Sequence, residues 1–117
     1  MEEKQPLLAV VGPTASGKTS LSIRLARLLD GEIISADSMQ MYRGMDIGTA
    51  KPTREEMAGI PHHLIDILEV DETFSVADYA ARVRPLIREI GGRGRLPILV
   101  GGTGLYVSAI TDHIQFS

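Results

Sequence analysis

The chain contains no cysteine among its 117 residues, which excludes disulfide bonds and metal sites built from thiolates. It also has no apolar run long enough to cross a membrane. Its first residues, Met1–Lys4, lack the basic and apolar regions of a signal peptide. A net charge of −3 argues against a general basic coat for nucleic acid. These absences favour a cytoplasmic protein that works without a membrane.

The most informative pattern that is present reads GPTASGKT and fits the phosphate-binding motif G-x-x-x-x-G-K-[ST] at every required position. An apolar, strand-like segment (6–11) precedes it, and leucines at helical spacing (18–29) follow it. In such a unit, backbone N–H groups and the positive end of the helix converge on a phosphate. We predict that the loop holds a diphosphate or polyphosphate, that Lys18 reaches the outer phosphates, and that the Thr19 hydroxyl holds Mg²⁺. The expected binding residues are Gly12, Pro13, Thr14, Ala15, Ser16, Gly17, Lys18 and Thr19.

Strand and helix patterns then alternate along the chain. The sequence predicts strands at 32–36, 63–68 and 96–100. Ser75 and Asp78 form a helix-start signal, and an apolar stripe follows it until two glycines end the helix at 91–92. The stripe consists of Tyr79, Val83, Ile87 and Ile90.

Further local signals refine this order. Gly31 is predicted to close the first helix as the residue just past its C-terminus. A short helix is predicted at 53–58, with a capping box from Thr53 to Glu56. Pro85 is expected to kink or break the helix that contains it. Another helix is expected to begin near Leu105.

Alternating strands and helices predict an α/β protein with a mainly parallel sheet, here a three-layer P-loop NTPase-like fold. Such a domain usually needs more than 117 residues, so we expect the chain to be an incomplete, truncated version of it. Ligands bind at the carboxyl ends of parallel strands. We therefore expect the loops at 12–18, 37–49 and 101–104 to converge on one crevice.

Polar residues in these loops are the candidates for chemistry. Asp37 follows an apolar strand, so it could coordinate magnesium through water, act as a general base, or simply serve as a turn aspartate. Gln40 carries an amide that can pair with adenine, and Thr103 offers a hydroxyl between two glycines. The pair His62-His63 favours a structural role, because adjacent residues of an extended segment point to opposite sides.

Four separated blocks together resemble the tRNA dimethylallyltransferase family, whose members are also called tRNA isopentenyltransferases. The blocks are GPTASGKT from Gly12, DSMQMYRGMDIGTAKP from Asp37, PHHLID from Pro61 and GGTGLY from Gly101, and they agree in order from Leu8 to about Tyr106. The resemblance implies that residues 1–117 form the P-loop core domain. Family members continue with a helical insertion that grips tRNA and with a C-terminal part, both absent here.

The resemblance also implies a reaction. The loop would hold the diphosphate of dimethylallyl diphosphate, and Lys18 and Thr19 with Mg²⁺ would stabilise it as it leaves. The acceptor would be the exocyclic amine of the adenosine 3′ of the anticodon, with Asp37 as general base. The full-length enzyme is expected to be a monomer, whereas the fragment alone is expected to lack parts needed for activity. Residues expected to meet the tRNA nucleotide are Asp37, Ser38, Met39, Gln40 and Thr103.

Three alternatives remain open at this point. The bare loop motif also indicates ATP or GTP, as in a small-molecule kinase, although no lid segment with arginines is evident. An adenylate isopentenyltransferase would use the same donor with a free nucleotide as acceptor. A non-catalytic nucleotide-binding module would keep the loop and lack the chemistry.

Overall fold

The computed structural model describes residues 7–11, 18–36, 41–43, 54–57, 59–69 and 71–101. Within them, one sheet contains four strands, and every neighbouring pair is parallel. This arrangement confirms the predicted parallel α/β fold. In spatial order the strands are β1 (Leu8–Val11), β4 (Leu96–Gly101), β2 (Gly31–Ser35) and β3 (His62–His63).

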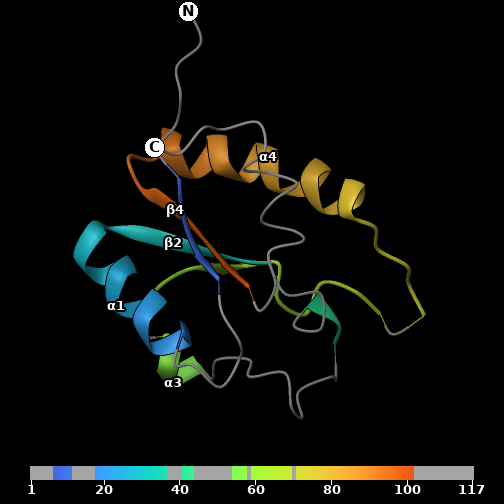
Figure 1. Cartoon of the computed structure of the whole chain (residues 1–117), viewed down its shortest axis with the longest axis horizontal. Helices are drawn as coiled ribbons and strands as arrows, with labels where there is room; N and C mark the ends of the chain where they lie inside the picture. The colour runs from blue at the N-terminus through green and yellow to red at the C-terminus, as the bar shows by residue number, and fades with distance from the viewer. Residues whose placement is uncertain are drawn as a thin grey trace, which may run out of the picture.

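Two helices cover opposite faces of the sheet, which makes the predicted three layers (Figure 1). Helix α1 (Lys18–Leu29) packs on one face and α4 (Val76–Gly92) on the other, while α3 (Arg54–Met57) is a single turn beside α1. Successive strand residues alternate between the layers, as the pleat requires. Ile33 therefore packs with the α1 layer and Ile34 with the α4 layer.

Helix α4 carries the predicted stripe, and all four of its members are buried against the sheet. Ser75 caps the helix: its hydroxyl accepts from the Asp78 N–H, and the Asp78 carboxylate accepts from the Ser75 N–H. The expectation that Pro85 breaks the helix is wrong, because α4 continues through it to Gly92. Pro85 lies on the exposed side of α4, where a lost backbone hydrogen bond is least costly, since water can replace the partner.

The prediction for Gly31 is also wrong. The left-handed residue after α1 is Asp30, with φ of 54°, and Gly31 is already the first residue of β2. Glycine is required at 31 for space, since an added Cβ would lie 2.7 Å from Ile98 Cδ1 and 2.8 Å from the Leu96 carbonyl oxygen.

The third strand is shorter than predicted. Only His62–His63 pairs with β2, and the chain then turns with Leu64 and Asp66 at φ of 66° and 58°. Left-handed backbone cannot continue a strand, so the apolar run was misleading there. Leu64 is buried in the core instead, and Leu68 forms an isolated parallel bridge with Tyr42.

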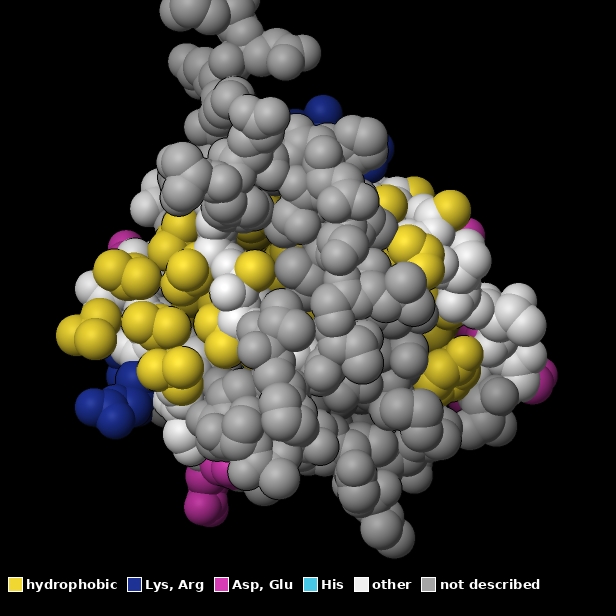
Figure 2. Space-filling view, viewed as in Figure 1, with side chains coloured by type: hydrophobic (Ala, Val, Ile, Leu, Met, Phe, Trp, Pro, Cys, Tyr) yellow, Lys and Arg dark blue, Asp and Glu magenta, His cyan; other side chains and the backbone are white. Residues whose placement is uncertain are grey.

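Helix α1 presents leucines to solvent. Leu21, Leu28 and Leu29 are 51%, 79% and 48% exposed, and Figure 2 shows apolar side chains gathered over this side of the molecule. No helix in the described ranges is long and apolar enough to span a membrane. The predicted capping residue Thr53 and the helix expected from Leu105 lie outside the described residues.

Candidate functional site

Three strands end at the same edge of the sheet. Val11, the last residue of β1, is level with Gly101, the last residue of β4, and Ser35 at the end of β2 is level with Val100. Because β4 lies between β1 and β2, the chain leaves the sheet at three adjacent points along this edge (Figure 1). The expected loops at 12–18, 37–49 and 101–104 begin within one or two residues of these strand ends, and Gly101 itself is still the last residue of β4.

Helix α1 begins at this same edge. It runs antiparallel to β1, which it follows after six residues, so its N-terminus lies beside the β1 carboxyl end. Lys18 and Thr19 are its first two residues. Strand, six-residue connection and helix start therefore have the order that phosphate binding by backbone N–H groups requires.

The entry to the 37–40 segment is held by β4. The Ala36 N–H donates to the Val100 carbonyl at 2.7 Å, and Ala36 is 1% exposed. Position 37 therefore follows directly in the chain after a buried, hydrogen-bonded residue.

The residue that follows this segment, Met41, is also fixed by hydrogen bonds. Met41 is fully buried, and its carbonyl accepts N–H bonds of 2.8 Å from both Ile67 and Leu68. The Arg43 N–H donates to the Leu68 carbonyl, also at 2.8 Å. The described residues on either side of the 37–40 segment, Ala36 and Met41, are therefore both buried and hydrogen-bonded.

The side chains after Met41 strengthen the exit anchor. The Tyr42 hydroxyl donates to the Glu72 carbonyl at 2.9 Å, and Arg43 Nε donates to the Asp66 carbonyl at 2.9 Å. Arg43 also forms an exposed ion pair of 3.5 Å with Glu69. The Arg43 guanidinium therefore already has partners within this chain.

Tyr79 was predicted only as a member of an apolar stripe, yet its hydroxyl supports the site. It donates 2.9 Å to the Ser35 carbonyl, in a fully buried position. The bond ties α4 to the end of β2, one residue before Ala36. A tyrosine in place of an aliphatic residue was the only signal in the sequence, since buried tyrosines usually find a partner for the hydroxyl.

The structure brings together the strand ends and helix start that carry the predicted site, but most of the predicted residues lie outside its described part. These are Gly12, Pro13, Thr14, Ala15, Ser16, Gly17, Asp37, Ser38, Met39, Gln40 and Thr103. Only the backbone of Lys18 and Thr19 is described. Their predicted contacts therefore stay predictions.

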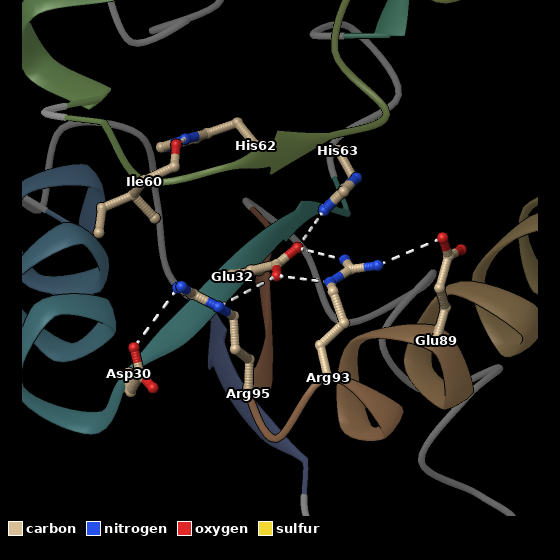
Figure 3. Close-up of polar contacts among 8 residues, drawn as sticks. All are labelled: Asp30, Glu32, Ile60, His62, His63, Glu89, Arg93 and Arg95. Atoms are coloured by element: carbon tan, nitrogen blue, oxygen red, sulfur yellow. Dashed lines mark hydrogen bonds and ion pairs between the residues drawn. The ribbon is translucent and has the colours of Figure 1, made fainter.

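A buried carboxylate occupies the opposite edge of the sheet, where β2 and β4 begin (Figure 3). Glu32, with a side chain 3% exposed, accepts from Arg93 Nη2 at 2.7 Å and from Arg93 Nε at 3.1 Å. Its Oε1 also lies 2.7 Å from His63 Nε2, and Arg95 Nε lies 3.7 Å from Oε2. The Arg93 hydrogen bonds lower the pKa of Glu32 against the opposing effect of burial, with a smaller lowering from His63.

This cluster is structural. Ala36 follows Glu32 by four positions, about 13 Å at the rise of a strand, so the cluster is remote from the strand ends. The histidine pair has the predicted structural role: His63 meets Glu32, and His62 Nδ1 lies 2.8 Å from the Ile60 carbonyl oxygen. Burial lowers the pKa of His62. The described residues contain no group of three His, Asp or Glu able to hold a metal ion.

The family model described as IPP transferase matches residues 40–117 of the chain. The chain belongs to this family. A relative from Bacillus velezensis, named tRNA dimethylallyltransferase, is 64% identical over 115 residues, covering 98% of the chain and 37% of the relative. The relative of that name from Bacillus subtilis is 63% identical over 114 residues, 97% of the chain and 36% of the relative. The chain thus spans little more than a third of the length of its curated relatives.

Solved structures agree with this IPP transferase membership. The full-length tRNA isopentenylpyrophosphate transferase of Bacillus halodurans superposes with a TM-score of 0.91 and 62% identity, over 97% of this chain and 38% of that chain. A eukaryotic dimethylallyltransferase described as acting on tRNA superposes with a TM-score of 0.86 and 36% identity, over 91% and 26%. The predicted P-loop NTPase-like fold and the predicted family are both confirmed.

Proposed function

We propose that this chain is the P-loop core domain, residues 1–117, of a tRNA dimethylallyltransferase. The enzyme transfers a dimethylallyl group from dimethylallyl diphosphate to the exocyclic amine of the adenosine 3′ of the anticodon. The observation that carries the proposal is the shared edge of β1, β4 and β2, where the chain runs from the sheet into three of the four motif blocks beside the start of α1. Membership of the IPP transferase family supports it.

The donor would be bound by the segment between β1 and α1. Its backbone N–H groups, the start of α1 and Lys18 would all face the diphosphate, which gains negative charge as the C1–O bond breaks. Thr19 would contribute its hydroxyl to Mg²⁺, with diphosphate oxygens and water as the other ligands. A hydroxyl and phosphate oxygens are hard donors that suit this ion, which would neutralise charge on the leaving group.

The acceptor would be bound by the segment at the end of β2. The exocyclic amine of adenine is a poor nucleophile because its lone pair is delocalised into the ring. As the N–C1 bond forms, Asp37 would take the amine proton, and diphosphate would leave with the electrons of the C1–O bond. Gln40 would recognise the adenine edge, with Ser38, Met39 and Thr103 lining the pocket of a nucleotide turned out of the anticodon stack.

The remaining two thirds of the curated relatives have no counterpart in this chain. We propose that they supply the helical insertion that grips tRNA and the rest of the core. Acting on tRNA, the full-length protein would work in the cytoplasm, and we expect it to be a monomer. Sedimentation of the full-length protein checks the oligomeric state.

A chimera tests the function. This chain replaces the matching part of the Bacillus halodurans enzyme, and the chimera is incubated with labelled dimethylallyl diphosphate and Mg²⁺. The acceptors are tRNA, AMP and ADP, and the unaltered Bacillus halodurans enzyme is the control. Label is expected in tRNA alone.

Each alternative has its own outcome. Label in AMP or ADP would favour an adenylate isopentenyltransferase. Phosphate transfer from ATP to small acceptors would favour a kinase. A folded chimera that labels nothing beside an active control would overturn the proposal.

A further inference from the structure

Gly101 ends β4 in a space too small for any side chain. An added Cβ would lie 2.8 Å from the Ala36 carbonyl oxygen and 2.9 Å from the Ala36 Cβ. Gly101 is not among the described glycines with positive φ, so its backbone would accept another residue. The requirement for glycine at this position is therefore one of space between β4 and the end of β2.

The residue that fills this space leads directly to Asp37. Ala36 is 1% exposed and is hydrogen-bonded to Val100, the neighbour of Gly101. Ala36 and Asp37 share a planar peptide bond, so a displacement of the Ala36 carbonyl also displaces the backbone nitrogen of Asp37.

We propose that Gly101 is a positioning residue for Asp37: its missing side chain lets Ala36 lie against β4 and so sets where the carboxylate meets the acceptor amine. This inference rests on the proposed function, in which Asp37 is the general base. It goes beyond that function by assigning a role to a residue to which the proposed function gives none.

The expected effect follows from the distances. To reach an ordinary contact distance, Ala36 would have to move by roughly half an ångström or more in a Gly101→Ala variant. A general base works within about 2.6–3.2 Å of the proton it accepts. A misplacement of about 1 Å can cost on the order of 10²-fold in rate. We expect kcat to fall about tenfold or more.

Gly31 provides a matched control between the same two strands. Its added Cβ would lie 2.7 Å from Ile98 Cδ1 and 2.8 Å from the Leu96 carbonyl oxygen, so Gly31→Ala is at least as crowded. Gly31 lies at the start of β2, however, five residues before Ala36, and its contacts Leu96 and Ile98 lie three residues or more before Gly101. Gly31→Ala should lower the melting temperature without changing kcat.

The experiment compares the chimera with its Gly101→Ala, Gly31→Ala and Asp37→Ala variants, below the melting temperature of each. Transfer to tRNA is followed with both substrates varied. In Gly101→Ala, kcat should fall about tenfold or more, while KM for dimethylallyl diphosphate stays within about twofold. Adding Gly101→Ala to Asp37→Ala should lower kcat by less than about a further twofold, because the base that Gly101→Ala would misplace is already absent.

Ala36→Gly extends the test to the other side of the contact. It removes the Cβ that faces Gly101 and loosens the same junction without crowding it. We expect kcat to fall about threefold or more, again with no further loss in the Asp37→Ala background. This variant decides the question if Gly101→Ala does not fold.

Several results would overturn the inference. These are an equal loss of kcat in Gly31→Ala, an unchanged kcat in Gly101→Ala, or a loss that multiplies with that of Asp37→Ala. If the chimera transfers label and only these comparisons fail, the proposed function stands and the positioning role is rejected. A folded but inactive chimera beside an active control would reject both.

Discussion

Replacing Glu32 by glutamine should destabilise the protein far more than any other single loss of an acidic charge near Arg93. Both carboxylate oxygens of Glu32 accept from Arg93, and Oε1 also meets His63. Glutamine keeps the shape but offers one acceptor oxygen, and its amide N–H groups face the donors of Arg93. The side chain is 3% exposed, so water cannot replace what is lost on the Glu32 side.

The magnitude follows from these contacts. Hydrogen bonds to charged groups contribute about 1.5–3 kcal/mol each, and a carboxylate removed from a buried pair costs about 3–5 kcal/mol. Arg93 and Arg95 are each 41% exposed, so water can partly solvate them after the change. We therefore expect Glu32→Gln to lower the free energy of unfolding by about 2–3 kcal/mol at pH 7.

Glu89 is the matched control, because its carboxylate pairs with the same Arg93 at 3.2 Å but is 63% exposed. Exposed pairs contribute about 0–1 kcal/mol, so Glu89→Gln should change the free energy of unfolding by about 0.5 kcal/mol or less. Urea unfolding of the two chimera variants, followed by circular dichroism, measures both. Equal effects of Glu32→Gln and Glu89→Gln would refute the reasoning.

The pH dependence supplies a second check on Glu32. Its pKa in the folded protein lies below the ordinary value of 4.5, chiefly because of the Arg93 hydrogen bonds. The ionised carboxylate therefore stabilises the folded state fully above about pH 4.5 and loses this contribution as the pH falls through the lowered pKa. The difference in free energy of unfolding between the unaltered chimera and Glu32→Gln should become smaller below pH 4.5. A difference that is unchanged down to pH 2 would contradict this.

Three further predictions concern the site and its surroundings. Asp37→Ala should lower kcat at least tenfold and leave diphosphate binding nearly intact, whereas Lys18→Ala should also weaken diphosphate binding. Isothermal titration with diphosphate and the tRNA assay check both variants. Unchanged turnover in Asp37→Ala would remove Asp37 from the role of general base. Tyr79→Phe removes a buried hydrogen bond to the end of β2 and should lower the free energy of unfolding by about 1 kcal/mol, measured by urea unfolding. An unchanged free energy of unfolding would show that this hydrogen bond makes no net contribution to stability. Leu28 is 79% exposed in this chain, and we expect the remaining part of the full-length relative to cover it in the chimera. Leu28→Asp should therefore lower the free energy of unfolding of the chimera by about 2 kcal/mol, whereas Arg24→Asp on the same helix should not. Equal effects of the two variants would contradict this.

Short-range patterns gave the most accurate predictions of the fold. Helix α1 has the predicted bounds, and the Ser75–Asp78 capping box lies where the sequence places it. Both depend on residues within a turn of one another, so local energetics suffices. The errors at Gly31 and after His63 arose where a distant segment decided the backbone.

The candidate site was predicted as a set of segments and not as a geometry. The pattern of strand ends indicated that three loops converge, and the level ends of β1, β4 and β2 agree with this. The contacts that support the site were missed, because they join residues far apart in the sequence. The Tyr79 hydroxyl contacts Ser35, 44 positions away, and Gly101 packs against Ala36, 65 positions away. Spacing in the sequence carries no information about such partners.

The sequence by itself determined the order of motifs, the family and the faces of the helices that are apolar, because these depend on residue type and on neighbours within a few positions. Only the tertiary structure decided that β4 lies between β1 and β2, that Glu32 meets arginines 61 residues away or more, and that Ala36 needs a glycine opposite it. The physical reason is that strand order, buried charge and close backbone approach are settled by packing between distant segments.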